Sequence, residues 1–540
     1  MNKPFKAAFL PLFFSIALII GMIAGNILSK SDGGSDANKK FATILKLIQN
    51  EYVDDVDLDS LLEKVLPDLL SNLDPHSCYI SKADLQGVNE ELDGSFSGIG
   101  VQFTINNDTI TVIEAISGGP SEKVGIQAGD RIVTVDGENV AGREITNEEV
   151  MKLLKGDKGT KVLLGIKRSN SKKILSYEVT RGDIPVSTID AAYMINDSTA
   201  YIKVNRFGRN TYADFLSALI LLAKDGAQNY VIDLRGNTGG YMEMAILMAN
   251  EFLPKGSVIV SKKGNHGKND EIFLADGNGA FSSEGVTILL DEYSASSSEI
   301  FAGAIQDNDR GLIIGRRSFG KGLIQRQAEL PDSSAIRLTI ARYYTPSGRC
   351  IQRDYSDSKI YREDIAQRYA HGELFSSDSI KQNTDLMFKT LTGRTVYGGG
   401  GIMPDIYIPV DTTDITRYYI NVANAGLLNK FAFEYSDLNR ETLSQIEDIE
   451  PALPSDAVLL RSFVNYASQN GIPAQWFYIN KSASLIVTQL KALIARDVAG
   501  IENYYRIMNR RDPVIKEALR QIGEGNNRAP VKQQLVRSGK

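Results

Sequence analysis

The chain has 540 residues, of which 43% are hydrophobic and 23% are charged, and its net charge is −6 at pH 7. It is too long for one hydrophobic core, so we expect three or four domains of ordinary globular composition. The acidic balance argues against a nucleic-acid partner, and the two cysteines, Cys78 and Cys350, cannot form a disulfide framework.

Histidine is scarce, since only His76, His266 and His371 are present. No two of them have the spacing of zinc ligands, so we predict no metal site, and no motif indicates a cofactor. A Ser-His-Asp triad stays open on the count alone, but none of the three follows a predicted strand. We interpret His76 as a turn residue.

The N-terminal segment favours a membrane anchor. Lys3 and Lys6 precede an uncharged run, 7–28, that is long enough to span a bilayer. We predict an uncleaved signal anchor at 1–30, in the inner (cytoplasmic) membrane, with the rest of the chain in the periplasm or otherwise outside the cytoplasm. A cleaved signal peptide is the alternative. Residues 31–84 are expected to form a linker and two short helices.

Short strands and glycine turns fill residues 85–182. A glycine turn, Gly98-Ile99-Gly100, leads into an alternating strand that contains Val101 and Phe103, and a short helix follows at 148–154. A glycine turn of this kind is usually a simple hairpin. The whole order nevertheless resembles a PDZ domain, in which such a turn holds a peptide's terminal carboxylate and the helix forms the other groove wall. We therefore expect a peptide site at Gly98, Ile99, Gly100, Val101, Phe103, Val150 and Leu154.

A second glycine turn follows the predicted buried strand 230–234. It reads Arg235-Gly236-Asn237-Thr238-Gly239-Gly240 and precedes a helix. The pattern lacks the lysine of a phosphate loop and the glycine spacing of a dinucleotide fold. Two interpretations remain: a tight turn without chemistry, or a turn whose backbone N–H groups hold a developing oxyanion.

Serines cluster where the next buried strand, 286–290, turns into a helix. The cluster spans 294–298, and the helix after it is predicted to be amphipathic, with Ile300, Phe301, Ala304 and Ile305 on its apolar face. A strand at 312–314 then leads to Gly320-Lys321-Gly322. This is what a Ser–Lys nucleophile pair needs, although a helix N-cap and a solvated lysine would explain each residue alone.

The remaining chain carries fewer signals. Residues 352–385 are polar and charged, and we expect them to form a surface excursion. Residues 411–540 are expected to form a helical domain whose role the sequence leaves open.

Four separated signatures resemble the carboxy-terminal processing peptidases of the tail-specific, S41 type. They are Leu73-Asp74-Pro75-His76-Ser77, the PDZ-like segment, Asn237-Thr238-Gly239-Gly240, and the stretch 294–325. The resemblance implies a multidomain α/β protein: a signal anchor, N-terminal helices, a PDZ β-domain (85–182), a crotonase- or ClpP-like serine protease core (183–410) and a helical C-terminal domain (411–540).

The resemblance also implies the roles of single residues. The lysine lies 25 positions after the nucleophile in this family, which selects Ser296 and Lys321, and Gln325 matches the glutamine that orients the lysine. Ser297 stands where alanine is usual, and Thr238 where proline is usual. The N–H of Ser297, with that of Gly239 or Gly240, matches the oxyanion hole. Asp307 matches a recurring aspartate that we expect to support the fold.

Elementary chemistry agrees with these roles. A lysine amine with an ordinary pKa is protonated at neutral pH and cannot act as a base. Burial beside Phe319 and Leu323, away from carboxylates, is expected to lower the pKa of Lys321. The implied substrates are proteins or peptides with free, apolar C-termini, and a homodimer or an adaptor protein stays open.

Two other functions compete with an endopeptidase. One is a binding protein, with the PDZ-like domain on a catalytically silent core. The other is a crotonase-like acyl-CoA enzyme, which shares the layout of strand, oxyanion turn and helix. Ser296, Lys321 and Gln325 together argue against the first, and the PDZ-like insertion argues against the second.

Overall fold

The computed structural model describes residues 36–93, 95–116, 118–168, 171, 173–185, 187–446 and 448–527. The predicted signal anchor, 1–30, lies outside these residues. Within them, no helix combines the length and the apolar character needed to cross a membrane. The chain divides into two compact units, Met1–Leu73 and Asp74–Lys540.

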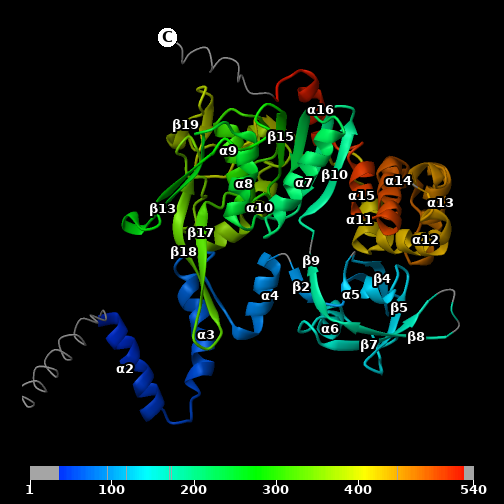
Figure 1. Ribbon diagram of the computed structural model, residues 1–540, viewed down its shortest axis with the longest axis horizontal. Coiled ribbons are helices and arrows are strands. Elements are labelled where there is room, and N and C mark those ends of the chain that lie inside the picture. Colours follow the sequence, from blue (N-terminus) through cyan, green and yellow to red (C-terminus); the bar gives the residue numbers. More distant parts are fainter. Residues whose placement is uncertain are drawn as a thin grey trace, which may run out of the picture. The chain divides into compact units, whose positions relative to one another are not determined.

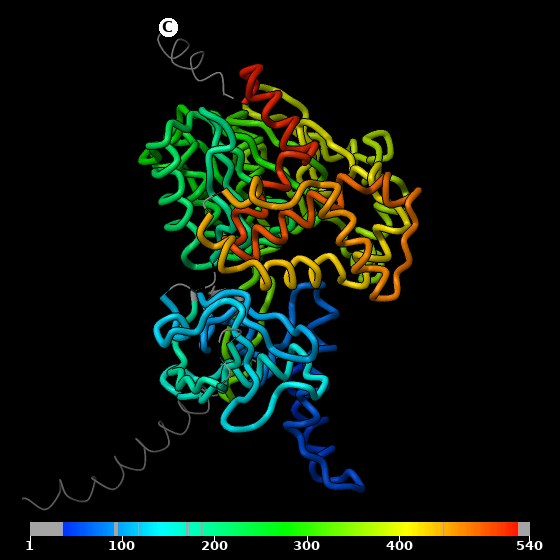
Figure 2. Tube along the Cα trace, turned by 90° about the vertical axis from the view of Figure 1, so that its right-hand side faces the viewer, coloured from blue at the N-terminus to red at the C-terminus, as the bar shows by residue number. Residues whose placement is uncertain are grey.

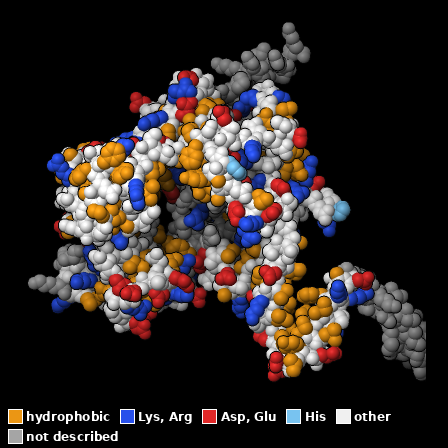
Figure 3. All heavy atoms as spheres, turned by 180° about the vertical axis from the view of Figure 1, so that it is seen from behind, with side chains coloured by type: hydrophobic (Ala, Val, Ile, Leu, Met, Phe, Trp, Pro, Cys, Tyr) orange, Lys and Arg blue, Asp and Glu red, His pale blue; other side chains and the backbone are white. Residues whose placement is uncertain are grey.

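The first unit contains two helices, α2 (Asp36–Glu51) and α3 (Leu58–Ser71), which confirms the helices predicted there. Asp57 caps α3 by accepting a hydrogen bond from the N–H of Asp59. Of the residues in α2 and α3, only Leu70 is buried. Large apolar side chains stand exposed on both helices: Phe41, Ile44, Leu47, Val65 and Leu69. Figure 3 shows a group of hydrophobic side chains, in orange, on the part of the chain that adjoins the grey N-terminal segment.

A β-domain follows α4 (Lys82–Asp93). Its sheet has the order β3-β4-β5-β7-β8, with β6 paired to β5. The strands are β3 (Val101–Asn106), β4 (Thr109–Ala115), β5 (Arg131–Val135), β6 (Glu138–Asn139), β7 (Lys161–Lys167) and β8 (Leu175–Thr180). The helices are α5 (Pro120–Val124) and α6 (Asn147–Leu154). At the two ends of the domain, β2 (Ser95–Gly98) pairs with β9 (Gly182–Pro185).

A six-stranded sheet forms the centre of the next domain, in the order β10-β11-β12-β15-β16-β21. All its neighbours are parallel except the edge pair β10–β11. The strands are β10 (Ile189–Asn196), β11 (Thr199–Val204), β12 (Asn229–Asp233), β15 (Gly285–Leu290), β16 (Leu312–Gly315) and β21 (Ile406–Tyr407). The buried strands predicted at 230–234 and 286–290 are thereby confirmed.

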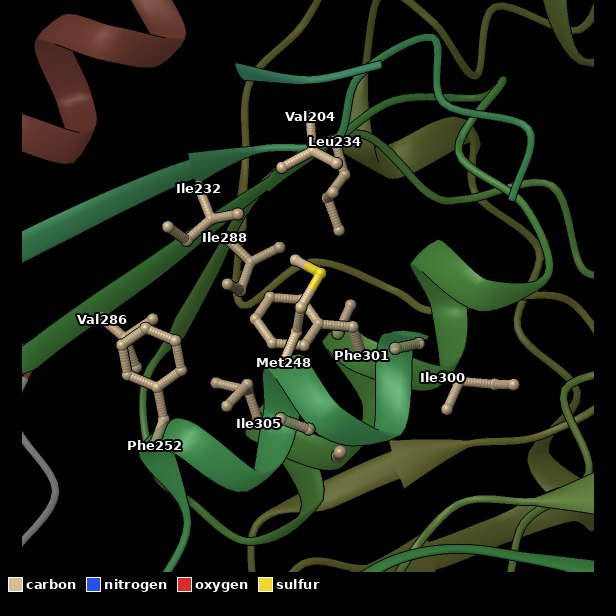
Figure 4. Close-up of a cluster of buried hydrophobic side chains, with 14 of the residues drawn as sticks. Val204, Ile232, Leu234, Met248, Phe252, Val286, Ile288, Ile300, Phe301 and Ile305 are labelled. Carbon is tan, nitrogen blue, oxygen red and sulfur yellow. The ribbon is translucent and has the colours of Figure 1, made fainter. Parts of the chain in front are cut away.

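Both faces of this sheet are covered, which is why its strands read as continuous apolar runs. One face packs against α7 (Thr211–Lys224), α8 (Met242–Phe252) and α9 (Ser297–Asp307). Figure 4 shows Met248 and Phe252 of α8, with Phe301 of α9, directed at Ile232 and Ile288 of the strands. The alternate strand residues face the opposite side, where they contact Val514, Ile515 and Ala518 near the end of the chain.

The prediction for α9 was wrong in one respect. Every residue of this helix is buried, so it is a central helix and not an amphipathic one. The reason is that elements beyond the sheet cover its second face, including β13 and the segment that contains Thr345. A Cβ atom on Gly303 would lie 2.8 Å from Thr345 Cγ2, so this contact requires a residue without a side chain.

A second sheet, of order β1-β18-β13-β14 with β17 paired to β18, lies in the same unit. Its strands are β1 (Cys78–Ile80), β13 (Val258–Gly264), β14 (Glu271–Leu274), β17 (Leu323–Glu329) and β18 (Ala335–Tyr344). A short pair, β19 (Met387–Lys389) and β20 (Thr395–Tyr397), follows later. Figure 1 shows β17 and β18 as a long hairpin, and the chain enters β17 directly after Lys321.

The predicted surface excursion at 352–385 was wrong in part, because it contains α10 (Ser358–Ala370) and several buried side chains. Three of these buried side chains each contact a residue far away in the sequence: Arg353, Tyr361 and Arg368.

The chain after residue 411 is helical, as predicted. The helices are α11 (Arg417–Asn424), α12 (Leu427–Leu443), α13 (Asp456–Gln469), α14 (Trp476–Ala499), α15 (Ile501–Met508) and α16 (Pro513–Gly523). The first four enclose a hydrophobic cluster of their own. The helix α16 packs against β15 and β16, and Arg235 pairs with Asp512, the residue before it, at 2.7 Å. Figure 2 shows this helix in red at the upper end of the described chain.

Candidate active site

Two turns meet at the carboxyl ends of the parallel strands β12 and β15. The N–H of Ala295 donates to the carbonyl of Asn237 at 3.0 Å, and Ser298 Oγ donates to the same oxygen at 2.9 Å. Ser297 Oγ donates to the carbonyl of Gly240 at 2.9 Å. The glycine turn and the serine cluster are therefore joined, at the edge of the sheet where open α/β folds bind ligands.

Ser296 lies at the junction of its turn with α9. Its backbone has φ 55° and ψ −114°, a conformation that costs a residue with a side chain energy and that recurs at functional sites. A Cβ atom on Gly239 would lie 2.7 Å from Ser296 Cβ, so the glycine turn approaches the serine as closely as backbone permits. Ser296 also stands at the positive end of the α9 dipole, which favours an alkoxide there.

The backbone N–H groups beside Ser296 differ in their hydrogen bonding. The N–H of Gly239 donates to Asn237 Oδ1 at 2.9 Å. Among the residues that the structure describes, the N–H groups of Gly240 and Ser297 have no acceptor. They are the two donors left to hold an anion next to Ser296.

Lys321 follows the Gly315–Gly320 segment and lies beside the serine turn. The N–H of Phe319 donates to the carbonyl of Ser294 at 2.9 Å, which fixes the two segments together. Burial lowers the pKa of Lys321, and the positive charge of Arg337 acts in the same direction, whereas Glu299 and Asp74 raise it. The expectation that Lys321 lies away from carboxylates was therefore wrong. The effect of burial on the pKa of Lys321 is nevertheless larger than the effects of Glu299 and Asp74.

Both of these side chains belong to the described residues, and no hydrogen bond joins Lys321 Nζ directly to Ser296 Oγ. Such bonds are often long before a substrate is bound. Gln325 lies on β17, and its Nε2 donates to Thr339 Oγ1 at 3.2 Å. The structure gives no hydrogen bond from Gln325 to Lys321.

The structure also places His76 near the lysine, which the sequence did not predict. His76 Nε2 lies 2.7 Å from the hydroxyl of Tyr361. Burial lowers the pKa of His76 to about 4, and the charge of Lys321 acts in the same direction, so the imidazole is neutral at pH 7. Asp74 holds this turn by accepting the N–H groups of His76 and Ser77. His76 and Tyr361 are 285 positions apart in the sequence, so no local pattern could predict this contact.

Asp307 has the supporting place that was expected for it. It pairs with Arg349 at 2.8 Å, and both side chains are fully buried. It also accepts a hydrogen bond from Ser347 Oγ at 2.6 Å. These bonds join the end of α9 to the segment after β18.

The predicted peptide-binding residues divide into two groups. Val101 and Phe103 are partly exposed on β3, the edge strand of the β-domain. Ile99, Val150 and Leu154 are buried in the hydrophobic core of that domain. Gly100 has φ +76°, and its carbonyl accepts the N–H of Ile116 at 3.0 Å. The peptide groove itself stays a prediction. Over the described ranges, no cluster of His, Cys, Asp and Glu is arranged to hold a metal ion.

A lysine with a lowered pKa beside a serine at a strand-to-helix turn is the arrangement of hydrolases that use an activated serine. Comparison with known proteins gives the particular class. Residues 97–179 match the PDZ domain, residues 198–360 match peptidase family S41, and residues 418–500 match a family of unknown function.

Two relatives are similar over much of the chain. The carboxy-terminal processing protease CtpB of Bacillus subtilis is 34% identical over 321 residues, which cover 59% of this chain and 66% of the relative. The carboxy-terminal-processing protease of Bartonella bacilliformis is 33% identical over 345 residues, 63% of this chain and 78% of the relative. This chain belongs to peptidase family S41 and is a carboxy-terminal processing serine protease with a PDZ domain.

Among solved structures, the photosystem II D1 C-terminal processing protease covers 69% of this chain and 87% of its own. Its identity is 24% and its TM-score is 0.36, so we draw no argument from this likeness.

Proposed function

We propose that this protein is an endopeptidase that binds free C-termini of proteins through its PDZ domain and cleaves them with a Ser296–Lys321 dyad. The observation that supports it best is the junction of three segments. A strained serine, a lysine with a lowered pKa and two unoccupied N–H groups meet at one edge of the central sheet.

In this mechanism Lys321 acts first as the base. Its neutral amine takes the proton of Ser296 Oγ as the oxygen attacks the substrate carbonyl carbon. The resulting oxyanion is held by the N–H groups of Gly240 and Ser297. The protonated amine then gives its proton to the leaving nitrogen. Water hydrolyses the acyl-enzyme, with Lys321 again acting as the base.

Gln325 was predicted to orient Lys321, and we keep this role as part of the proposal. Its amide is held by Thr339, whose own N–H donates to Ser77 Oγ at 3.1 Å. Gln325 therefore belongs to a chain of hydrogen bonds that ends at the Asp74–Ser77 turn.

The PDZ domain would supply the substrate tail. A free C-terminus adds as a strand along the edge of β3, and its carboxylate lies against the N–H groups of the Gly98–Gly100 turn. An apolar last residue fits a groove whose base is formed by the buried Ile99, Val150 and Leu154.

For the location, we propose an N-terminal anchor in the inner (cytoplasmic) membrane, with the protease domains outside the cytoplasm. The proposal depends on the uncharged run 7–28 and the two lysines before it. Single cysteines are introduced at positions 40 and 224 of a chain whose Cys78 and Cys350 have been replaced by serine. Their accessibility to an impermeant thiol reagent in intact cells tests the location, and labelling seen only after lysis contradicts it.

The test of the proposed activity uses the purified full chain and an unfolded protein with an apolar C-terminus. The same protein with an amidated terminus serves as the comparison. Cleavage is expected to depend on the free carboxylate and to be lost in both Ser296→Ala and Lys321→Ala. Ser217→Ala and Lys224→Ala, exposed changes on α7, are the matched controls and should cleave normally.

Cleavage that persists in Ser296→Ala or Lys321→Ala contradicts the site. A parent chain that binds the tail without cutting it would favour the binding-protein alternative.

A further inference from the structure

Glu299 connects the serine turn to the lysine turn. It lies in the first turn of α9, and its side chain is fully buried. One carboxylate oxygen, Oε2, accepts the N–H of Ser296 at 2.9 Å and the N–H of Lys321 at 2.8 Å. The other, Oε1, accepts the N–H of Gly320 at 2.7 Å and a short hydrogen bond from Ser318 Oγ.

A second side chain spans the same two turns with opposite polarity. The hydroxyl of Tyr343, on β18, donates to the carbonyl of Lys321 at 2.8 Å and lies 3.2 Å from the carbonyl of Ser296. Tyr343 is fully buried and its pKa is well above the ordinary value because of burial. Both N–H groups and both carbonyls of Ser296 and Lys321 are thus tied to one acceptor and one donor.

We propose that Glu299 is a positioning residue that sets the spacing between the nucleophile and the base, and that its ionised form is required for this. The inference rests on the proposed roles of Ser296 and Lys321. Glu299 touches neither the reacting atoms nor the substrate, and it acts through the backbone of the two residues that do. A dyad without a direct hydrogen bond depends on such backbone ties for its geometry.

The four hydrogen bonds make the site specific for a carboxylate. Three of the donors are backbone N–H groups, which cannot turn into acceptors. A protonated Glu299 carries an O–H on one oxygen, and that oxygen then faces a backbone donor. Protonation therefore weakens the hydrogen bonds that hold the two turns, because the O–H oxygen is a poorer acceptor than a carboxylate oxygen. Only Ser318 can adapt, since its hydroxyl rotates.

The electrostatics place this change in an accessible pH range. Burial raises the pKa of Glu299 to about 7, while the hydrogen bonds from Ser318, Lys321, Gly320 and Ser296 lower it. The titratable groups that face it are Lys321, Tyr343 on β18 and Tyr361 on α10. Its charge raises the pKa of each. Acidification through about pH 7 should therefore loosen the dyad. Protonation of Lys321 lowers the activity in the same direction.

The test is a pH profile of kcat and KM for three full-length variants on the tail-bearing substrate. Glu299→Gln keeps the shape but places an NH₂ group against two donors, so we expect kcat to fall about 10- to 100-fold with KM changed less than about threefold. It also removes a negative charge beside Lys321. The acidic limb of the profile should therefore move to lower pH, which a loss of packing alone would not cause.

Ser318→Ala gives the opposite displacement. It removes one hydrogen bond that favours the carboxylate, so the pKa of Glu299 rises and the acidic limb should move to higher pH. Glu251→Gln is the matched control. Glu251 is also buried and also hydrogen-bonded, to Tyr212 and the N–H of Ala280, but it lies in α8 away from the two turns. Its profile should equal that of the parent.

A Glu299→Gln enzyme with the parent's kcat and acidic limb overturns the proposal. If Glu299→Gln does not fold, the pH profile of Ser318→Ala tests the proposal instead. An acidic limb of Ser318→Ala that stays in place or moves to lower pH overturns the proposal. Failure of the proposed function gives a different result, because Ser296→Ala or Lys321→Ala would then remain active whatever Glu299 does.

Discussion

The protein contains two glycine turns that carry backbone N–H groups, and they are built differently. The PDZ turn, Gly98-Ile99-Gly100, is fixed within its own domain, through the N–H groups of Ile116 and Ser121. The core turn, 237–240, is fixed by a second turn 57 to 61 residues later, which carries Ser296. Under the proposed function, the first turn is a binding site in itself, whereas the second is half of a site.

This difference decides how each turn should respond to change. A substitution in the PDZ turn affects the capture of a tail and leaves the chemistry intact. A substitution in the core turn disturbs the nucleophile at the same time, because the two turns share hydrogen bonds and are in van der Waals contact.

The largest effect is expected on the lysine side of the core site. Lys321→Met should lower kcat by about 10⁴- to 10⁶-fold, since it removes the amine that we propose as the base. It should also raise the melting temperature at pH 7. Burial lowers the pKa of Lys321, so its positive charge destabilises the folded state at every pH below the folded pKa.

That destabilisation disappears as the pH rises to the ordinary lysine value of 10.5, so the stability gain of Lys321→Met should shrink above neutral pH. Thermal unfolding between pH 7 and pH 10 measures it, with Lys224→Met as the exposed control. A melting temperature below that of the parent at pH 7 contradicts this account of the lysine.

Gly239→Ala should lower kcat by about 100-fold or more. Gly239 has φ +103°, and the new methyl group would lie 2.7 Å from Ser296 Cβ and 2.9 Å from the carbonyl oxygen of Ala295. Gly236→Ala is the control, since Gly236 has φ +73° in the same turn but nothing within 4 Å of the added atom. Equal activities for the two variants would show that backbone strain, not contact with the nucleophile turn, causes the loss.

Gly100→Ala tests the PDZ side of the comparison. The added methyl group would lie 2.8 Å from Ile184 Cδ1 and 3.2 Å from Pro120 Cδ, so either the turn or the Ile184 side chain must shift. We expect KM for tail-bearing substrates to rise about 10-fold, with hydrolysis of a short ester unchanged. Gly118→Ala, with φ +73° and open space, controls for strain. A fall in ester hydrolysis would contradict the independence of the two turns.

The smallest effect is expected for Ser297→Ala, which restores the residue usual in the family. The extra hydroxyl donates to the carbonyl of Gly240 and so joins the two turns. The backbone N–H that we assign to the oxyanion remains. Loss of one such hydrogen bond should lower kcat by about 2- to 10-fold. A complete loss of activity would show that the hydroxyl itself takes part in the chemistry.

The sequence predicted what local pattern encodes. Continuous apolar runs indicated the buried strands β12 and β15, and the residues after each strand indicated the two turns. The spacing found in the family that the chain resembles then selected Ser296 and Lys321, which the structure places in neighbouring segments. Each of these strands and turns is a short segment, and its own residues are enough to predict it.

Contacts between distant segments were missed. His76 and Tyr361 meet across 285 positions, and Arg353 stacks between the rings of Phe319 and Tyr361 at 3.8 and 4.0 Å. Nothing in the polar composition of 352–385 shows that these side chains become buried. Glu299 was not singled out from the sequence, because three of its four hydrogen-bond partners come from the lysine turn, 318–321.

The central claim is that Lys321 activates Ser296 and none of the three serines beside it, Ser294, Ser297 and Ser298. Covalent labelling tests this claim most directly. The full chain is treated with a fluorophosphonate, and the modified peptide is sequenced by mass spectrometry for the parent and for Lys321→Ala. We predict one adduct, on Ser296, formed faster as the pH rises and at least about 100-fold more slowly in Lys321→Ala. An adduct on Ser294, Ser297 or Ser298, or an equal rate in the variant, would contradict the account.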